Sequence, residues 1–484
     1  MNRYYLRRSG NFKGMDIPAV IDFNKLDLIE DLSERGKDYV IKGDILILNR
    51  VNRYHTREFV KKIIKIRTDH MDKILYLPGF GFPVDYPVLF YLGIDILDDS
   101  PLRVIGNDRC ITEFGFIQGK DCIEKNLREK DRVMELIRLS VENNLFRELV
   151  ESHLFSPFSK EVLRILDMDY YDMMLPFSDS RRKNVRALTI DSIYRPEIRE
   201  FRSKVREMKQ TAPNLLLIPC SAVKPYSRSK THRILHSLIH PYLNYLQEVI
   251  VTTPLGLVPR ELENFFPVSD YDVPVTGYWF NEEKIMLENI AKDFFSDKKY
   301  ENVFFILSEE ESGIIRLFDD PKGVTGVINF STSEELLSIL SSRKLRGDRQ
   351  KKKRTEIINM VKYLYDVDLE IEGIEIKDEG NRSLILYKDE YLLKMTSSGL
   401  TMEMGLAKIL CSKNKRIINV KGKFNGSNIF VPGIESIGRD IKPGMEVALM
   451  KDGEPIGRGI AEVASLDLAI DGKGIAVSDV KYFH

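Results

Sequence analysis

The sequence is poor in cysteine, has a single tryptophan and carries no net charge. Its four cysteines form no C-x-x-C pair, so neither a disulfide framework nor a structural zinc site is expected, and a reducing cytoplasm is the expected compartment. Basic and acidic residues number 73 each, so any surface that binds nucleic acid must be local. Apolar runs of about eighteen residues and a signal-peptide core are both missing, so no membrane partner is expected.

The length of the chain predicts several domains, because 484 residues exceed what one hydrophobic core usually organises. Residues 1–195 mix short apolar runs with amphipathic helices. Residues 196–342 alternate strand and helix patterns, which favours a parallel sheet. Residues 343–412 indicate a small α+β unit that begins with a basic linker, and residues 413–484 turn to short strands separated by glycine. The expected fold is a mixed α/β and α+β multidomain chain.

The second of these domains has the clearest pattern of apolar residues. Strands are expected at residues 215–219, 248–253, 302–308 and 324–330, and helices at 230–247, 281–296 and 333–341. In open α/β sheets, ligands bind where parallel strands end. The loops that follow these strands are therefore the first place to search for a functional site.

Reactive side chains are concentrated in residues 219–232, directly after the first of those strands. The stretch reads P-C-x3-K-P-Y-x2-S-x2-H and supplies Cys220, Lys224, Tyr226, Ser229 and His232. A catalytic cysteine with charged partners is one interpretation. A small core cysteine followed by a proline-containing turn is the other. The residue types alone leave both open.

The same stretch resembles the signature of archaeosine synthases at every defined position. Two later loops, residues 254–261 and 271–279, resemble that family as well and contribute Arg260, Asp272 and Thr276 as candidate substrate-binding residues. The resemblance implies a catalytic α/β domain that modifies tRNA carrying 7-cyano-7-deazaguanine at position 15. It further implies that the enzyme adds an amine across the nitrile, with free lysine as the donor and a glutamine-derived nitrogen as the alternative. The implied partner is a radical-SAM lyase that cleaves the adduct.

Each reactive residue has a role that this chemistry would require. His232 is the only imidazole of the motif and is the candidate base that deprotonates the amine. Lys224, Tyr226 and Ser229 are candidate donors to the nitrile nitrogen as it gains negative charge. Cys220 either attacks first to give a covalent thioimidate or only shapes the pocket. Asp272 is the candidate anchor for the cationic amine. A P-loop and an H-E-x-x-H motif are missing, so neither a cofactor nor a metal is expected.

Residues 91–100 are similar to the G-x-D-x-x-D stretch of tRNA-guanine transglycosylases, with Asp98 at the position of the nucleophile. The Pro-Thr-Arg and the zinc cluster of that family are missing, and Cys122 with Asn126 cannot complete a four-ligand zinc site. We therefore expect a degenerate TIM-barrel-like domain that serves as a scaffold or contacts tRNA. Alternatively, Asp98 is simply a polar residue at a strand end.

Two regions are candidates for contact with RNA. Residues 424–434 and 440–447 resemble the opening of a PUA domain, a small β-barrel that binds RNA, although another small β-barrel would fit the strand pattern. The candidate phosphate contacts of this domain are Lys421, Lys423, Arg439 and Lys442. The basic linker, residues 343–354, holds eight lysines and arginines and fits a solvated helix face as well as phosphate contacts.

Two other functions compete with the leading interpretation. A base-exchanging transglycosylase would act through Asp98, but its zinc cluster is missing. A non-catalytic subunit that binds tRNA would not need the titratable groups of residues 219–232. The sequence reveals neither the oligomeric state nor the conformation of the bound tRNA.

Overall fold

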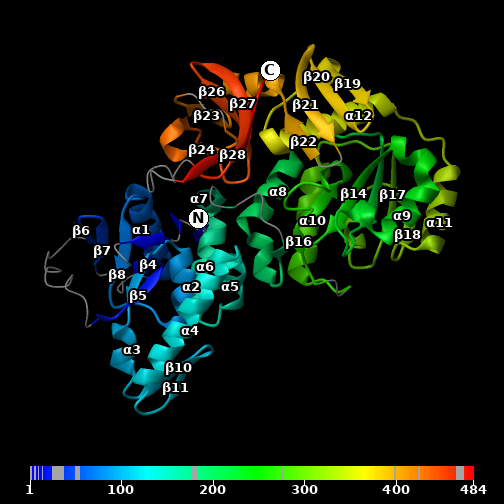
Figure 1. The fold of residues 1–484 in the computed structure, drawn as a ribbon. Coiled ribbons are helices and arrows are strands. Elements are labelled where there is room, and N and C mark those ends of the chain that lie inside the picture. The colour runs from blue at the N-terminus through cyan, green and yellow to red at the C-terminus, as the bar shows by residue number, and fades with distance from the viewer. Residues whose placement is uncertain are drawn as a thin grey trace. The chain divides into compact units, whose positions relative to one another are not determined.

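The chain forms two compact units, which are labelled by element in Figure 1. The computed structural model describes residues 3–4, 7–8, 10–12, 15–23, 38–49, 55–175, 178, 184–274, 277–396, 399–422, 426–464 and 474–483. The first unit comprises residues 1–178 with 463–474, and the second comprises residues 179–462 with 475–484. Among the helices of the described residues, none combines the length and apolarity needed to cross a membrane.

The first unit is built on a five-stranded sheet. Its order is β5 (Ala19–Ile21), β9 (Ile96–Asp98), β8 (Ile74–Leu77), β7 (Ile45–Leu48) and β6 (Tyr39–Lys42), and only the β6–β7 pair is antiparallel. Strands β7 and β8 bury every side chain, which explains their unbroken apolar sequences. The helices include α1 (Thr56–Asp69), α2 (Tyr86–Tyr91), α3 (Ser100–Ile105), α4 (Ile123–Glu142), α5 (Phe146–Ser152), α6 (Pro157–Asp169) and α7 (Tyr171–Met174). The mixed α/β character is confirmed, whereas closure into a TIM-like barrel is not.

The second unit opens with the α/β domain that contains residues 219–232. Its sheet has the order β15 (Gly256–Pro259), β14 (Leu246–Thr252), β13 (Asn214–Pro219), β17 (Asn302–Leu307) and β18 (Lys322–Thr325). All neighbours are parallel except β15, which returns antiparallel beside β14. Helices α8 (Pro196–Arg206), α9 (Lys230–Ile239), α10 (Asn281–Phe295) and α11 (Phe330–Ser341) belong to the same domain. The predicted parallel sheet is confirmed.

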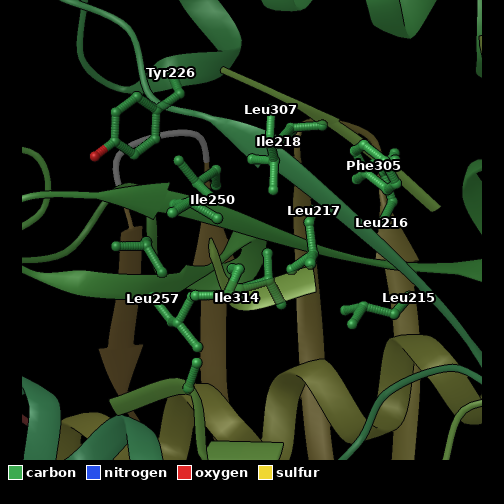
Figure 2. Close-up of a cluster of buried hydrophobic side chains, with 14 of the residues drawn as sticks. Leu215, Leu216, Leu217, Ile218, Tyr226, Ile250, Leu257, Phe305, Leu307 and Ile314 are labelled. Carbon is green, nitrogen blue, oxygen red and sulfur yellow. The ribbon is translucent and has the colours of Figure 1, made fainter. Parts of the chain in front are cut away.

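The core of this domain lies around β13. Leu215, Leu216, Leu217 and Ile218 are fully buried and pack with residues of the neighbouring strands, as Figure 2 shows. Burying a leucine or isoleucine side chain contributes about 2 kcal/mol each relative to exposure. Cys220, the first reactive residue, directly follows Pro219, the last residue of this strand. The buried core around β13 therefore fixes the backbone position of Cys220.

Two smaller β-rich regions complete the second unit. Helix α12 (Arg349–Tyr365) leads to a meander of β19 (Ile374–Glu379), β20 (Arg382–Tyr387), β21 (Glu390–Thr396) and β22 (Gly399–Met402), followed by α13 (Met404–Ser412). A six-stranded sheet follows in the order β24 (Ile429–Phe430), β28 (Ile475–Tyr482), β27 (Glu454–Ala461), β26 (Glu446–Lys451), β23 (Ile417–Val420) and β25 (Ile434–Ile437). The basic linker thus extends into the first turns of α12.

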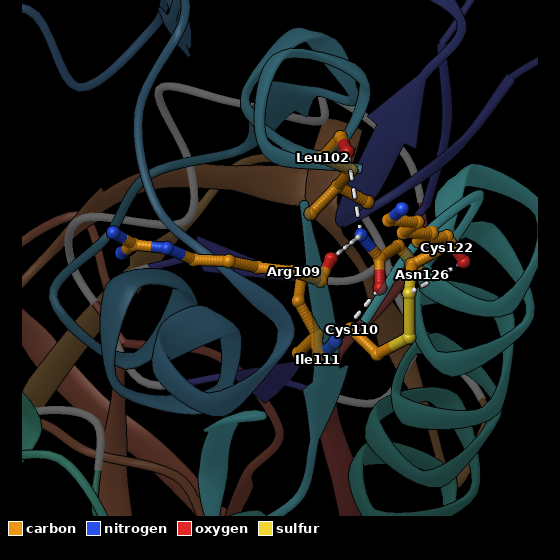
Figure 3. Close-up of a disulfide and its surroundings, with 7 residues drawn as sticks. Leu102, Arg109, Cys110, Ile111, Cys122 and Asn126 are labelled. Carbon is orange, nitrogen blue, oxygen red and sulfur yellow. Dashed lines mark hydrogen bonds between the residues drawn. A yellow bond between two sulfur atoms is a disulfide. The ribbon is translucent and has the colours of Figure 1, made fainter. Parts of the chain in front are cut away.

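The sequence predicts no disulfide framework, but two of the four cysteines are paired. Cys110 of β10 (Arg109–Thr112) forms a disulfide with Cys122, the residue before α4 (Figure 3). The hairpin of β10 and β11 (Gly115–Gln118) returns the chain so that the two Cα atoms lie 5.0 Å apart. Asn126 supports the hairpin, because its side-chain oxygen accepts from the Ile111 N–H at 2.8 Å. The spacing of twelve residues between the two cysteines in the sequence does not by itself predict that the hairpin brings them together.

Candidate functional site

The candidate site lies at the carboxyl edge of the α/β sheet. Strands β13, β14 and β17 run parallel, so the residues after each of them gather at this edge. The Cys220 N–H donates to the Val251 carbonyl at 3.1 Å, which continues the pairing of β13 with β14 beyond the last strand residue. The thiol therefore starts from a rigid backbone position.

The Cys220 thiol is half-buried beside Lys224 of its own loop and polar groups from two other segments. Burial raises its pKa above the ordinary value; the Thr252 hydroxyl and Lys224 act to lower it, and the Glu311 carboxylate acts to raise it. Because burial dominates, Cys220 is a protonated thiol at neutral pH. A proton acceptor must therefore take part if this thiol is to attack an electrophile.

Lys224 supplies an amine with the opposite shift. Burial lowers its pKa, while charges at Cys220 and Asp272 act to raise it. Its Nζ atom lies 4.0 Å from the centre of the Tyr271 ring. Asp272 itself is exposed at the end of β16 (Tyr271–Asp272). A partly buried amine with a lowered pKa loses its proton more readily than a surface lysine, so Lys224 is a candidate proton acceptor near Cys220.

Three hydroxyl groups connect the motif to the sheet. The Tyr226 and Tyr271 hydroxyls lie 2.7 Å apart, and the Tyr271 hydroxyl lies 2.6 Å from Thr252 Oγ1. Tyr226 is completely buried, and burial raises the pKa of both phenols. Both tyrosines therefore stay neutral. The chain of hydroxyls ends beside the Cys220 thiol and holds Thr252 in place.

His232 is fully buried, and both of its ring nitrogens have hydrogen-bond partners. Its Nε2 lies 3.1 Å from the Pro219 carbonyl oxygen, and its Nδ1 lies 3.0 Å from Arg260 Nη2. Because Arg260 can only donate, Nδ1 accepts and Nε2–H donates to Pro219. Burial, followed by the Arg260 charge, lowers the pKa of His232 to about 3. A neutral imidazole with both nitrogens occupied is poorly suited to receive a substrate proton, which favours a positioning role for His232 over the predicted role of a base.

Arg260 and Ser229 also support the motif from below. Arg260 Nη1 donates to Glu263 Oε2 at 2.9 Å, and the same oxygen accepts from the Ser227 N–H at 2.9 Å. Ser229 caps α9, because its Oγ accepts from the His232 N–H at 3.2 Å. These contacts hold the loop and the imidazole, so neither residue faces a substrate in this arrangement.

The structure thus brings Cys220, Lys224 and Tyr226 together, with Asp272 acting on Lys224 through its charge. Thr276 lies outside the described residues. Sequence reasoning missed Thr252, Tyr271 and Glu311. Thr252 ends β14, Tyr271 belongs to a loop that the motif analysis had already selected, and Glu311 follows β17. Attention to every parallel strand end would have found Thr252 and the loop that contains Glu311, and Tyr271 is the first residue of a loop already selected for its resemblance.

Asp98 belongs to the first unit and is completely buried at the end of β9. Its Oδ2 accepts from the Tyr76 hydroxyl at 2.9 Å and from the Gly79 N–H at 2.6 Å. Its Oδ1 accepts from the Ser100 N–H at 2.9 Å and from the Ser100 hydroxyl. Two donors on each oxygen use the hydrogen-bonding capacity of the carboxylate. This arrangement agrees with the polar strand end that was the alternative interpretation.

The predicted phosphate contacts have different surroundings. Lys421 and Arg439 are exposed, whereas Lys423 lies outside the described residues. Lys442 is only 5% exposed and its ammonium forms an ion pair with Glu200 of α8. Lys442 therefore binds a carboxylate of its own chain and is not available to phosphate.

The Glu200–Lys442 pair predicts a loss of stability that depends on pH. Burial acts against ionisation of Glu200, but Lys442 and Lys204 prevail and lower its pKa to about 2. The pKa of a glutamate in the unfolded chain is about 4.3, so the stabilisation by this pair is present above that pH and is lost as pH falls towards about 2.

Glu200→Ala leaves a buried ammonium uncompensated. The substitution is expected to lower the free energy of unfolding by about 3–5 kcal/mol at pH 7, measured by urea denaturation.

The exposed pair Lys408–Glu390, with 2.7 Å between the charged atoms, provides the control. Glu390→Ala is expected to cost less than about 1 kcal/mol, because both side chains are half-exposed. Equal losses in the two variants would show that Glu200 contributes no more than a surface charge.

The geometry also predicts that His232 does not titrate near neutrality. In protein labelled with ¹⁵N-histidine, one imidazole should keep the neutral Nε2–H form from pH 5 to 9, and that signal should vanish in His232→Gln. A His232 signal that titrates near the ordinary pKa of about 6.5 would restore its role as a base.

The sequence matches two known domain patterns and several known proteins. The pattern described as DUF5591, a domain of unknown function, matches residues 198–344, and the PUA domain pattern matches residues 420–481. The chain is 29% identical over 433 residues to archaeosine synthase subunit alpha of Thermoplasma acidophilum, covering 87% of this chain and 84% of the relative. It is 25% identical over 514 aligned positions to archaeosine synthase subunit alpha of Methanosarcina acetivorans, covering 93% and 81%.

A tRNA-guanine(15) transglycosylase of Methanocaldococcus jannaschii is more distant, at 19% identity over 509 aligned positions, covering 93% of this chain and 71% of the relative. The resemblance that the motifs carry is therefore confirmed: the chain is similar to archaeosine synthases over most of its length and contains a PUA domain.

Proposed function

We propose that this chain is an archaeosine synthase, a tRNA-modifying transferase that adds an amine to the nitrile of 7-cyano-7-deazaguanine at position 15. The observation that carries the proposal is the Cys220–Lys224 pair, which lies at the carboxyl edge of a parallel sheet within the part of the chain shared with relatives of that name. The pKa of Cys220 is raised and the pKa of Lys224 is lowered, so the neutral form of each group is favoured. Neutral groups suit addition to an uncharged nitrile.

The first step joins Cys220 to the substrate. The sulfur forms a bond to the nitrile carbon, one carbon–nitrogen π bond breaks, and the thiol proton passes through the Lys224 amine to the nitrile nitrogen. The product is a thioimidate. Lys224 suits the transfer because burial lowers its pKa, while the raised pKa of Cys220 keeps the thiol protonated until the nitrile arrives.

The second step transfers the donor amine. Its nitrogen bonds to the thioimidate carbon, the carbon–sulfur bond breaks, and the amine proton passes through Lys224 to the departing thiolate. The product is an amidine, and Cys220 returns to its starting state. Free lysine is the proposed donor and a glutamine-derived nitrogen the alternative. The exposed Asp272 carboxylate beside Lys224 would attract a cationic amine to this edge.

The same geometry assigns supporting roles to the remaining motif residues. His232 and Arg260 hold the Pro219 carbonyl and the loop after it, Ser229 starts helix α9, and Tyr226 orders Thr252 through Tyr271. The relatives are named as alpha subunits, which supports a partner subunit. We propose that this partner is the radical-SAM lyase that consumes the amidine.

Base exchange through Asp98 is disfavoured by the hydrogen bonds that surround it. A nucleophile must present a lone pair to the ribose carbon, but each oxygen of Asp98 already accepts two hydrogen bonds in a fully buried position. Asp98→Asn should consequently leave amidine formation intact in any variant that folds.

The central test follows nucleosides by mass spectrometry after incubation with nitrile-bearing tRNA and free lysine. Cys220→Ala is expected to lower the rate at least about 1,000-fold, because the nucleophile is lost, and Lys224→Met at least about 100-fold, because the proton carrier is lost. Cys411→Ala is the matched control, since Cys411 is the other half-buried free cysteine, and should retain full activity.

Omitting lysine should trap the covalent step. Wild-type protein and Cys411→Ala are expected to gain the mass of the tRNA under mildly acidic denaturing conditions, whereas Cys220→Ala should not. If Cys220→Ala retained wild-type turnover, the thiol would have no chemical role. Full turnover without any trapped adduct would favour direct attack of the donor amine on the nitrile.

Binding by the PUA domain predicts a specific change in salt dependence. Lys421→Gln and Arg439→Gln remove exposed cations, so each is expected to reduce the slope of log K against log salt by about 0.7–0.9. Lys408→Gln in α13 is the control and should leave the slope unchanged. Unchanged slopes in the first two variants would indicate that the phosphate contacts lie in the basic linker instead, where Arg343, Lys344 and Arg346 are exposed.

A further inference from the structure

Two exposed aromatic side chains stand in the loop between β16 and α10. Tyr278 is 82% exposed and Phe280 is 68% exposed, although aromatic residues are normally among the most buried. The loop begins after Asp272, the carboxylate that acts on Lys224. Exposed rings beside a candidate site indicate that a ligand covers them.

Hydrogen bonds fix the backbone of this loop to the carboxyl edge of the sheet. The Phe280 N–H donates to Glu283 Oε2 at 2.8 Å, and Glu283 Oε1 accepts from Thr253 Oγ1 at 2.5 Å. Thr253 directly follows Thr252, which neighbours the Cys220 thiol. The backbone of Phe280 is therefore connected to the end of β14 through the Glu283 carboxylate.

A second tie reaches the loop that follows β17. The backbone N–H of Trp279 donates a hydrogen bond to the Glu310 carboxylate. Glu310 also forms an ion pair with Lys284, with 2.5 Å between Oε2 and Nζ. The next residue, Glu311, is the carboxylate whose charge acts on Cys220. The backbone of residues 279–280 is thus held to loops that follow β14 and β17, the strands whose ends border the thiol.

The motif also carries exposed cations. Arg228 and Lys230 are exposed within residues 219–232, a few positions after Lys224. Aromatic rings together with cations are the combination that binds single-stranded nucleic acid, because bases stack on the rings and phosphates pair with the cations.

We propose that Tyr278 and Phe280 form a stacking platform for unstacked bases of the tRNA at the entrance to the Cys220 site. The inference rests on the proposed function, because the base at position 15 must leave the folded core of tRNA before its nitrile reaches a thiol. Stacking on the exposed rings offsets the contacts that the extruded base loses. Tyr278 and Phe280 are positioning residues and take no part in bond formation.

Steady-state kinetics with full-length nitrile-bearing tRNA test the platform. Tyr278→Ala and Phe280→Ala are each expected to raise KM about tenfold or more while kcat stays within about twofold, because stacking is lost and the chemical groups are retained. Tyr278→Phe and Phe280→Tyr should restore wild-type KM, since a ring remains. Tyr391→Ala is the control, because Tyr391 is 51% exposed on β21 in another part of the second unit.

A photochemical cross-link distinguishes failure of the platform from failure of the proposed function. Binding is measured with Cys220→Ala protein and tRNA carrying 5-iodouracil next to position 15, so that no turnover is required. Irradiation is expected to link the RNA to the peptide containing residues 277–284. The cross-link should appear even if wild-type protein forms no amidine, in which case the platform stands and the reaction assignment falls.

Two results would overturn the platform. One is an unchanged KM in both alanine variants together with no cross-link to residues 277–284, while wild-type protein forms the amidine. The other is that the alanine variants lose binding to a protein partner while their affinity for tRNA stays at the wild-type value. In that case the rings would serve a protein interface.

Discussion

Desolvation at the carboxyl edge of the α/β sheet is the constraint on which the candidate chemistry depends. The same partial burial raises the pKa of Cys220 and lowers that of Lys224, so both groups are pushed towards their neutral forms. In an open, polar site at neutral pH the thiol would also keep its proton, but the amine would remain an ammonium. Here burial lowers the pKa of the Lys224 amine, so this amine gives up its proton more readily than an exposed lysine. This favours addition to a nitrile, whose nitrogen must receive a proton as the carbon is attacked.

The buried network beneath the motif explains how that edge keeps its shape. Glu248 accepts from Arg260 at 3.3 Å and pairs with His236 at 2.7 Å, while Arg260 continues to His232 and from there to the Pro219 carbonyl. Burial opposes ionisation of Glu248, but Arg260 and His236 lower its pKa well below the usual range. A charged carboxylate and guanidinium, both largely buried and mutually paired, fix the imidazole by polar contacts that are costly to break.

The elements of the α/β domain were largely predictable because their signals are local. The strand expected at residues 215–219 is β13, that at 302–308 is β17, and the helix expected at 281–296 is α10. The helix expected at 230–247 is shorter: α9 ends at Ile239, and a 3₁₀ segment with Pro241 at its start follows. The strand expected at 324–330 begins two residues earlier, and Asn329 instead caps α11. The division into four domains remains a prediction.

The roles of the site residues were less predictable because they depend on long-range contacts. The sequence brings His232 close to Cys220 but says nothing of Arg260, whose guanidinium occupies one ring nitrogen from 28 positions away. Lys442 looked like a surface cation until its partner 242 positions earlier was known. Thr252 lies in no recognised motif, and Tyr271 was passed over within its loop, because only the folded chain shows that their hydroxyls connect to each other and to Tyr226 near Cys220.

Asp98 shows the same principle in the first unit, where a motif was kept in sequence but its surroundings determine its chemistry. A carboxylate attacks ribose only if one oxygen is accessible and its lone pair is free. Asp98 instead joins the Tyr76 hydroxyl, the Gly79 N–H and both donors of Ser100 in a buried position, so it links the ends of β8 and β9 to the start of α3. Removing any of these donors would leave an unsatisfied buried charge, which favours their retention for stability. Burial therefore has different consequences in the two units: Cys220 is a half-buried thiol near the Lys224 amine, whereas Asp98 is fully buried with hydrogen bonds on both oxygens, which suits a structural role.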